Sequence, residues 1–296
     1  MERMHMLNVF LAVGETQGFA AAANRMRLSP AAVTRAIAGL EKMLGVELLQ
    51  RTTRNVRLTE AGRRYLGDIR HIVSQIDHVN DSTSPAPRGR LVVSAPESFG
   101  KTFVLPCIAA FLKRYPAVDV VASFDSRGAE LGEGVDVAVA IGSLRDPGLL
   151  ATGAGRVRTV LCASPAYLAR RGRPSHPGDL LQHAIIGLGE GRDPVAWKFA
   201  DGGGGGVIMH LRPRLAVTTE AAGAAAACAG LGVARLLSYT VAEPIAQGRL
   251  QPLLESHAEG AQPVHILRRE QCSGLPKIAR FVDLLAEQLR ANSLLQ

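Results

Sequence analysis

The amino-acid sequence predicts two folded units, a small N-terminal α+β unit and a larger C-terminal α/β unit with two lobes. Apolar residues recur at helical spacing at the start of the chain, a segment rich in Ser and Pro follows at residues 81–89, and strands alternate with helices beyond it. The 296 residues are 47% hydrophobic and 20% charged, which is the composition of a globular protein with enough apolar surface for two cores.

The chain is predicted to begin with two helices and a turn. Apolar residues at helical spacing over residues 4–13 predict the first helix, which ends within residues 14–18. An Ala-rich stretch over residues 19–26 predicts a short second helix, and a turn at residues 27–28 follows it. A short helix that ends in a tight turn is the first half of a helix-turn-helix.

A third helix and two short strands complete this unit. Ser29 is a preferred N-cap residue and Pro30 suits the first helical position, so we expect the helix to begin there and to end at Gly45. Residues 46–50 and 55–58 have the pattern of two short strands around a wing. The predicted arrangement is a winged helix-turn-helix, whose third helix enters the major groove of DNA with its N-terminal turn.

Positive charge is concentrated in the same part of the chain. The formal net charge is +8, and basic residues outnumber acidic ones between residues 25 and 64. The basic residues there are Arg25, Arg27, Arg35, Lys42, Arg51, Arg54, Arg57, Arg63 and Arg64, and the acidic ones are Glu41, Glu47 and Glu60. Such a local excess is typical of a surface that binds nucleic-acid phosphates.

The first turn of the third helix carries the residues that we expect to contact DNA. These are Ser29, Pro30, Ala31, Thr34 and Arg35. Arg35 suits a bidentate contact to guanine, Thr34 suits a base or a phosphate, and the Ala31 methyl suits a thymine methyl group. A phosphate contact or a solvated position is the alternative for Arg35, because at least half of protein–DNA hydrogen bonds go to the backbone.

The predicted wing adds Arg51, Arg54 and Arg57, which hold phosphates or enter the minor groove in this interpretation. Arg51 has an alternative role as an internal ion-pair partner of Glu41 or Glu47. Arg54 is therefore the better candidate for a contact from the wing.

Residues 59–80 are predicted to form a long amphipathic helix, which the segment Thr59-Glu60-Ala61-Gly62 opens. Its apolar residues are Tyr65, Leu66, Ile69, Ile72, Val73, Ile76 and Val79. A long apolar stripe that leaves a small unit needs a partner, and a second copy of the same helix is the simplest one. The segment that follows has the composition of a linker.

The C-terminal unit is predicted to contain two α/β cycles. The first has strands over residues 90–94, 118–124, 135–141 and 157–163 and a helix over 104–115. The second has strands over residues 184–187, 215–217 and 263–268, a hairpin of 196–199 and 207–210, and helices over 220–229, 239–247 and 275–289. The glycine run 202–206 lacks the Lys-Ser or Lys-Thr of a phosphate-binding loop, so we expect a flexible loop there. The pattern predicts mostly parallel sheets in two lobes that share a cleft and are crossed by two strands.

Nearly the whole chain resembles the LysR-type family of bacterial transcription regulators. In the N-terminal unit the matching residues are Leu7, Phe10, Val13, Phe19 to Ala22, Leu28 to Ile37, Leu40-Glu41, Leu44-Gly45, Leu48-Leu49, Arg51 to Arg54 and Leu58 to Gly62. In the C-terminal unit they are Ala95 to Gly100, Leu161 to Leu168 and Ala229 to Ala234. Gly18 and Ala20 depart from the family, which usually has a serine at the first position and often a serine or threonine at the second. These departures remove a helix cap and a phosphate contact.

The resemblance implies a fold of class α+β and α/β: an N-terminal winged helix-turn-helix with a long linker helix, and a C-terminal two-lobed α/β effector domain similar to periplasmic solute-binding proteins. It implies a sequence-specific DNA-binding transcription regulator whose activity a small-molecule effector modulates from the cleft. The expected boundaries are 1–58 for the winged domain, 59–81 for the dimerisation helix, 82–90 for the hinge and 91–296 for the effector domain, with lobe I at about 91–161 and 267–296 and lobe II at about 162–266. The implied partners are double-stranded promoter DNA, an effector and a second copy in a dimer or tetramer, with RNA polymerase as a further candidate.

The resemblance also places effector-binding residues along the two walls of the cleft. They are Ser98, Phe99, Asp125, Ser126 and Gly142 on one wall and Thr218 and Thr219 on the other. Helix N-termini at such a site favour an anion. Helix capping is the alternative role of Ser98 and Thr219. Glu97 and Glu220 would repel an anion if both faced the cleft, which leaves an uncharged or cationic ligand open.

Other classes of function are not favoured. A nucleophile elbow, HExxH, Walker A or dinucleotide fingerprint is missing, so we expect neither an enzyme nor a cofactor. Cys107, Cys162, Cys228 and Cys272 form no CxxC pair, so buried reduced thiols are expected rather than a metal site or disulfides, with redox sensing as the alternative. The sequence has no signal-peptide core and no membrane-spanning run, which predicts a cytoplasmic protein and disfavours a stand-alone solute-binding protein.

Overall fold

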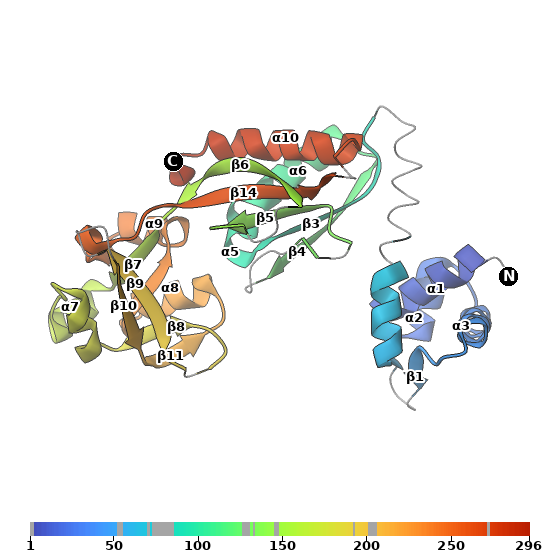
Figure 1. Ribbon diagram of the computed structural model, residues 1–296, viewed down its shortest axis with the longest axis horizontal. Helices are drawn as coiled ribbons and strands as arrows, with labels where there is room; N and C mark the ends of the chain where they lie inside the picture. The colour runs from blue at the N-terminus through green and yellow to red at the C-terminus, as the bar shows by residue number, and fades with distance from the viewer. Residues whose placement is uncertain are drawn as a thin grey trace. The chain divides into compact units, whose positions relative to one another are not determined.

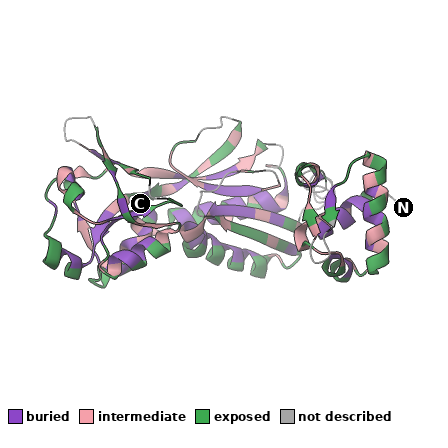
Figure 2. Ribbon diagram, turned by 90° about the horizontal axis from the view of Figure 1, so that it is seen from below, coloured by how far each residue is buried: buried purple, intermediate pink, exposed green. Residues whose placement is uncertain are grey.

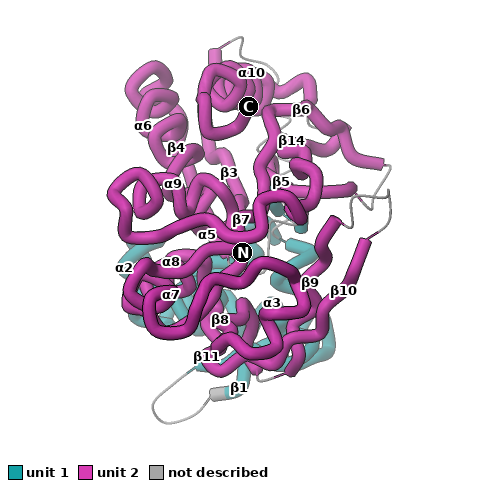
Figure 3. Tube along the Cα trace, turned by 90° about the vertical axis from the view of Figure 1, so that its left-hand side faces the viewer, with its two compact units in different colours: residues 1–85, 132–135 teal, residues 86–131, 136–296 magenta. Residues whose placement is uncertain are grey.

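The computed structural model describes residues 3–51, 56–69, 72, 86–125, 131–132, 134–144, 148–191, 193–200, 206–270 and 273–296. The chain divides into two compact units, Met1–Pro85 with Gly132–Val135 and Ala86–Leu131 with Asp136–Gln296 (Figure 3). Each unit has hydrophobic cores of its own, and buried residues occupy the inner faces of its helices and strands (Figure 2).

The N-terminal unit is a winged helix-turn-helix, as the sequence predicts (Figure 1). Its elements are α1 (Arg3–Thr16), α2 (Phe19–Met26), α3 (Pro30–Leu44), β1 (Leu49–Arg51) and β2 (Val56–Leu58). The two strands pair antiparallel, and residues 60–69 form a helix after them. The tip of the expected wing and most of the expected helix beyond residue 69 lie outside the described residues.

The start and end of α3 follow from two local features. The Ser29 side chain accepts a hydrogen bond from the Ala32 N–H at 3.2 Å, and Pro30 stands at the first helical position. Gly45 ends the helix with φ +70°, a left-handed conformation that suits glycine. The inner face, with Val33, Ile37 and Leu40, is fully buried against α1 and α2 in the core of this unit.

Lobe I of the C-terminal unit is built on a five-stranded sheet in the order β4-β3-β5-β14-β6. The strands are β3 (Gly89–Pro96), β4 (Val118–Asp125), β5 (Val137–Ile141), β6 (Leu149–Val157) and β14 (Gln262–Arg269). Its helices are α5 (Glu97–Phe99), a π-helix at Gly100–Val104, α6 (Leu105–Arg114) and α10 (Pro276–Arg290). β3 is parallel to β4 and β5, whereas β14 is antiparallel to β5 and β6, so the sheet is mixed.

Lobe II has a second five-stranded sheet in the order β11-β8-β12-β7-β13. Its strands are β7 (Thr159–Ala163), β8 (Ile185–Leu188), β11 (Pro213–Val217), β12 (Val233–Leu237) and β13 (Gln251–Leu253), and β9 (Val195–Ala200) forms a hairpin with β10 (Gly206–Leu211). Its helices are α7 (Pro165–Arg171), α8 (Glu220–Cys228) and α9 (Ser238–Ala246), with 3-10 turns at Pro177–Gln182 and Glu255–His257. The predicted two-lobed α/β arrangement is present.

The strand expected over residues 157–163 is wrong as a single element. The chain forms β6 up to Val157 and β7 from Thr159, and these strands belong to different sheets. Arg158 lies between them, at one of the two places where the chain passes from lobe to lobe; residues 254–261 form the other. An apolar run shows that a segment is buried, but it does not show that the segment changes sheet in the middle.

Candidate DNA-binding surface and effector site

The outer face of α3 presents the residues expected to contact DNA. Ser29, Pro30, Ala31 and Arg35 are exposed, and Thr34 is half-buried. Arg35 is an exposed cation that makes no ion pair with any described residue. This outer face of α3 is polar and exposed because the apolar residues of the helix lie on the opposite face, against α1 and α2.

Two of these side chains already have local hydrogen bonds. Ser29 caps α3, as described above. The Thr34 hydroxyl donates to the Pro30 carbonyl at 3.0 Å, which leaves its oxygen lone pairs as acceptors. The Arg35 side chain, which has no such local bond, is therefore freer than Thr34 to donate hydrogen bonds to acceptor atoms on the edge of a base.

Neighbouring charges are partly neutralised. Arg25 pairs with Glu15 at 2.6 Å, and Arg64 pairs with Glu60 at 2.5 Å. Both pairs are exposed on at least one side, so they contribute little to stability. Arg57 on β2 is exposed and makes no ion pair with a described residue.

One of the two glutamates considered as partners of Arg51 has local hydrogen bonds. Glu41 accepts hydrogen bonds from the N–H groups of Leu48 and Leu49, at 2.9 and 3.1 Å, and so holds the turn between α3 and β1. Arg51 ends β1, but its side chain lies outside the described part of the chain, and Arg54 lies outside it entirely.

In lobe I the segment after β3 carries Ser98 and Phe99. Ser98 caps no helix: its hydroxyl is buried and has no hydrogen-bond partner among the described residues. The Phe99 ring is fully buried in the lobe I core, 4.7 Å from the Phe103 ring centroid. Its packing gives Phe99 a structural role, whereas Ser98 has an unused polar atom.

The other expected effector residues are spread over both lobes. Gly142 follows β5 with φ +97°, and its N–H donates to the Pro263 carbonyl at 2.9 Å. Thr219 caps α8 by accepting a hydrogen bond from the Ala222 N–H at 3.1 Å, whereas Thr218 is exposed. Asp125 ends β4 and is exposed, and Ser126 lies outside the described residues.

Two buried groups of lobe II, at the start of α8 and of α9, add to this region. Glu220 accepts a hydrogen bond from the Leu237 N–H at 2.9 Å, and burial raises the pKa of its carboxyl above the ordinary value. Tyr239 belongs to α9, but its ring packs edge-on against Phe99 at 5.5 Å in the lobe I core. Burial, followed by the nearby charges of Glu220 and Glu97, raises the pKa of the Tyr239 hydroxyl, which therefore stays protonated. No motif or periodicity pointed to Tyr239, because its position depends on how the two lobes meet.

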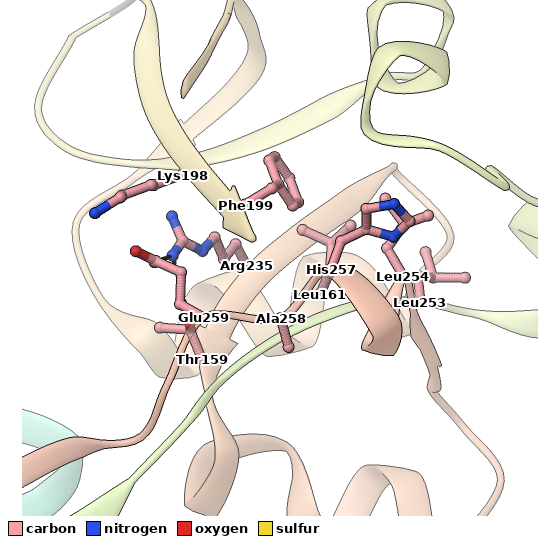
Figure 4. Close-up of a pocket in the computed structure, with 10 residues that line it drawn as sticks. All are labelled: Thr159, Leu161, Lys198, Phe199, Arg235, Leu253, Leu254, His257, Ala258 and Glu259. Carbon is pink, nitrogen blue, oxygen red and sulfur yellow. Dashed lines mark hydrogen bonds and ion pairs between the residues drawn. The ribbon is translucent and has the colours of Figure 1, made fainter. Parts of the chain in front are cut away.

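Lobe II also contains a small surface pocket between β9 and the main sheet. Lys198, Arg235 and Glu259 reach one end of it, and His257 lies at the other beside Leu253 and Leu254 (Figure 4). Arg235 is already paired with Glu259 and also donates to the Thr159 hydroxyl at 3.4 Å. The Arg235–Glu259 ion pair therefore balances two of the three charges at this end, and Lys198 contributes a further positive charge.

Two of the described thiols, Cys107 and Cys162, are unsuited to reaction. Burial raises the pKa of Cys107 and of Cys162 to about 12, so both stay protonated at neutral pH. Cys228 is half-buried, and Cys272 lies outside the described residues. Within the described ranges no group of His, Cys, Asp or Glu side chains is arranged to hold a metal ion, and no helix is long and apolar enough to cross a membrane.

Two family models together match most of the chain. The LysR substrate binding domain matches residues 84–290, and the helix-turn-helix of bacterial regulatory proteins of the lysR family matches residues 4–63. Among curated proteins, the HTH-type transcriptional regulator PtxR of Pseudomonas aeruginosa is 34% identical, with 98% of this chain and 95% of that protein covered. The uncharacterized HTH-type transcriptional regulator YhjC of Escherichia coli is 31% identical, with 90% of each protein covered.

Solved structures of full-length regulators have the same fold. The Vibrio cholerae virulence activator AphB has a TM-score of 0.66 at 26% identity, with 97% of this chain and 99% of that chain covered. CrgA, a LysR-type regulator from Neisseria meningitidis, has a TM-score of 0.62 at 28% identity over the same shares of the two chains. Regulators of this family bind promoter DNA and small-molecule effectors and form oligomers. The chain therefore belongs to the LysR family, and it is a DNA-binding transcription regulator with an effector-binding domain.

Proposed function

We propose that α3 reads the operator and that Arg35 makes the principal contact to a base. The observation that carries this proposal is the exposed Arg35 side chain, which makes no described ion pair and stands one turn into a capped helix. A guanidinium in that position reaches the O6 and N7 atoms of guanine with two parallel hydrogen bonds. The exposed Ala31 methyl packs against a thymine methyl group, and Ser29, Pro30 and Thr34 complete the contact surface.

The wing positions the protein on the duplex in this proposal. Arg51 and Arg54 contact phosphates or enter the minor groove, which fixes the register of α3 but carries little sequence information. The chain divides into a winged domain over residues 1–58, a helix over 59–81 and a hinge over 82–90 in this proposal. The helix pairs with the same helix of a second copy. The functional oligomer is then a dimer or tetramer that binds successive half-sites.

The effector site lies between the lobes, at the ends of β3, β4, β5 and β11 in this proposal. Its residues are Ser98, Phe99, Asp125, Ser126, Gly142, Thr218 and Thr219. The unpartnered Ser98 hydroxyl supports a direct contact with the ligand, whereas the bond that Thr219 accepts from Ala222 supports a capping role beside any ligand contact.

Effector binding changes the relative placement of the DNA-binding units and so alters DNA bending or contact with RNA polymerase. A ligand achieves this only by binding one arrangement of the oligomer more tightly than another. This role is regulatory rather than catalytic, and the protein acts on the chromosome in the cytoplasm. An unchanged DNase footprint in the presence of every ligand that binds the effector domain would contradict the coupling.

The DNA-reading role is tested with the duplex just upstream of the gene for this protein and a shuffled duplex of equal length. We expect the full-length protein to prefer the native duplex, and Arg35→Ala to weaken specific binding by about 10- to 100-fold. Arg212→Ala removes one exposed positive charge from β10–β11 of the other unit and serves as the matched control.

A salt series separates the two roles that Arg35 can have. Loss of a base contact weakens the native duplex much more than the shuffled one, whereas loss of a phosphate contact weakens both equally and lowers the salt slope by about 1. Equal loss on both duplexes would assign Arg35 to the phosphate backbone. If Arg35→Ala binds both duplexes with wild-type affinity, the proposal that α3 contacts the operator through Arg35 is wrong.

A further inference from the structure

The two faces of the lobe II sheet are covered differently, and the side chains of β12 alternate between them. Val233 belongs to the core on the side of the β9–β10 hairpin, whereas Ala234 and Leu236 belong to the core on the side of α8. Arg235 stands between the last two residues, so its side chain points to the hairpin face. The small pocket of lobe II lies on this face, and the residues that line it are all different from those of the proposed effector site.

Two cations and one carboxylate meet at one end of this pocket. Figure 4 shows the side chains of Lys198, Arg235 and Glu259 gathered there. Glu259 pairs with Arg235, whose side chain is only 16% exposed, and Lys198 makes no ion pair with any described residue. One positive charge is therefore in excess beside a largely buried guanidinium. An anion bound at this end would leave it without net charge, whereas a cation would meet two like charges.

Arg235 keeps N–H donors that a ligand can use. Its Nη2 atom donates to Glu259 and to the Thr159 hydroxyl, the latter at 3.4 Å. Its Nε and Nη1 atoms have no hydrogen-bond partner within the described part of the chain. A guanidinium carries five N–H donors in a planar fork that matches the two oxygens of a carboxylate. Lys198 adds an ammonium at the same end, so the donors fit a carboxylate group.

The remainder of the pocket is mostly apolar. Leu161, Phe199 and Leu253 line it and are buried in the lobe II core, and Leu254 packs against that core. Small-molecule sites typically combine such apolar walls with a few polar groups that fix the orientation of the ligand. A carboxylate with a short apolar body uses both parts of the pocket.

We propose that this pocket binds a small organic carboxylate through Lys198 and the unpaired N–H groups of Arg235. It is a second ligand site, separate from the proposed effector site and independent of it. The carboxylate shares Arg235 with Glu259, and the apolar body of the ligand lies against Phe199 and Leu253.

The pocket is also built at both crossings between the lobes. Thr159 directly follows the crossing at Arg158, and Glu259 belongs to the crossing over residues 254–261. Arg235 contacts both, so one guanidinium connects the two crossings to β12. A carboxylate that shares Arg235 weakens its contact with Glu259 and so loosens the second crossing. A ligand bound here therefore favours an arrangement of the lobes in which that crossing is less tightly held.

The test uses isothermal titration of the full-length protein, at low ionic strength, with propionate, propionamide and n-propylammonium as probes of matched shape. We expect propionate to bind, propionamide to bind at least tenfold more weakly, and n-propylammonium not to bind. Lys198→Gln removes the unpaired charge and should weaken propionate by about fivefold. Glu259→Gln removes the competing carboxylate and should strengthen propionate by about fivefold. Lys113→Gln, at an exposed position of α6 in lobe I, is the matched control for loss of one positive charge and should leave the affinity unchanged.

One further variant locates the bound propionate. Ser98→Ala alters the proposed effector site and should leave the affinity for propionate unchanged if the pocket is the site. A weaker affinity in Ser98→Ala together with an unchanged one in Lys198→Gln would place propionate in the effector site and overturn the pocket. The pocket is equally overturned if propionate does not bind, if propionamide or n-propylammonium binds as tightly as propionate, or if neither Lys198→Gln nor Glu259→Gln changes the affinity.

Discussion

Glu220 illustrates how a single buried carboxyl combines two opposed effects. Burial raises its pKa above the ordinary value of 4.5, and the hydrogen bond from the Leu237 N–H at 2.9 Å opposes that rise without cancelling it. A residue whose pKa is raised by folding stabilises the native state when it is protonated. Its contribution is fully present below pH 4.5 and is lost as the pH rises through the raised pKa.

This linkage predicts the pH dependence of Glu220→Gln. Glutamine keeps an acceptor for the Leu237 N–H but carries no charge, so the variant should be more stable than the wild type at neutral pH. The difference should shrink toward zero as the pH falls to about 4.5, because the wild-type carboxyl is then protonated. Urea unfolding of both proteins across this pH range measures it. A gap that is independent of pH would show that Glu220 does not titrate differently in the folded state.

The element that joins the wing to the helix at 60–69 depends on a glycine. A Cβ at Gly62 would overlap the Leu48 carbonyl oxygen, and Leu48 is buried directly before β1. The Gly62 N–H also donates to the Thr59 hydroxyl at 2.9 Å, which caps the helix. The helix therefore lies so close to the preceding backbone that only glycine fits.

Gly62→Ala should accordingly destabilise the N-terminal unit by about 2 kcal/mol, because the neighbour is backbone and cannot move aside as a side chain would. Gly45→Ala is a useful comparison, since a Cβ there meets nothing within 4 Å but φ is +70°. It should destabilise through backbone strain alone, by about 1 kcal/mol. Circular dichroism melts of the full-length wild type and of the two variants measure both effects. Equal stability of Gly62→Ala and wild type would show that the helix can shift.

At the scale of the molecule, the hydrophobic cores are separate. One core draws its residues from Met6 to Ile69, and the others draw theirs from Leu91 to Leu295. Cooperative unfolding follows the extent of a shared core, so units with separate cores unfold separately.

We expect scanning calorimetry of the full-length protein to show at least two transitions. Gly62→Ala should lower the midpoint temperature of the N-terminal unit's transition and leave that of the C-terminal unit unchanged. Glu220→Gln should raise only the midpoint temperature of the C-terminal unit at neutral pH. The upstream duplex should raise the transition that Gly62→Ala lowers, because a ligand stabilises the unit that binds it. A single transition that both variants shift together would show that the two units unfold as one.

Local sequence determined the elements of the N-terminal unit closely. The cap of Ser29, the proline that follows it and the glycine at 45 act within one turn of α3, so no distant contact is needed to place its ends. Short-range periodicity likewise predicted the hairpin of β9 and β10 and helix α10. The resemblance of motifs at fixed spacing then led to the family.

Tertiary structure alone decided where lobes begin and which polar groups lack partners. The sequence shows an apolar run at 157–163, but the division at Arg158 depends on pairing with β14 on one side and with β12 and β13 on the other. Strand β6 was not predicted, because most of its residues are small or exposed and its apolar residues do not alternate regularly with polar ones. Sequence reasoning named Ser98 and Phe99 from one segment, yet Tyr239 joins this segment through ring packing on Phe99, between residues far apart in the chain. Periodicity and capping act over a few residues and can be read along the chain, whereas strand order, the lobe crossings and the partners of a buried hydroxyl depend on contacts that only the folded protein makes.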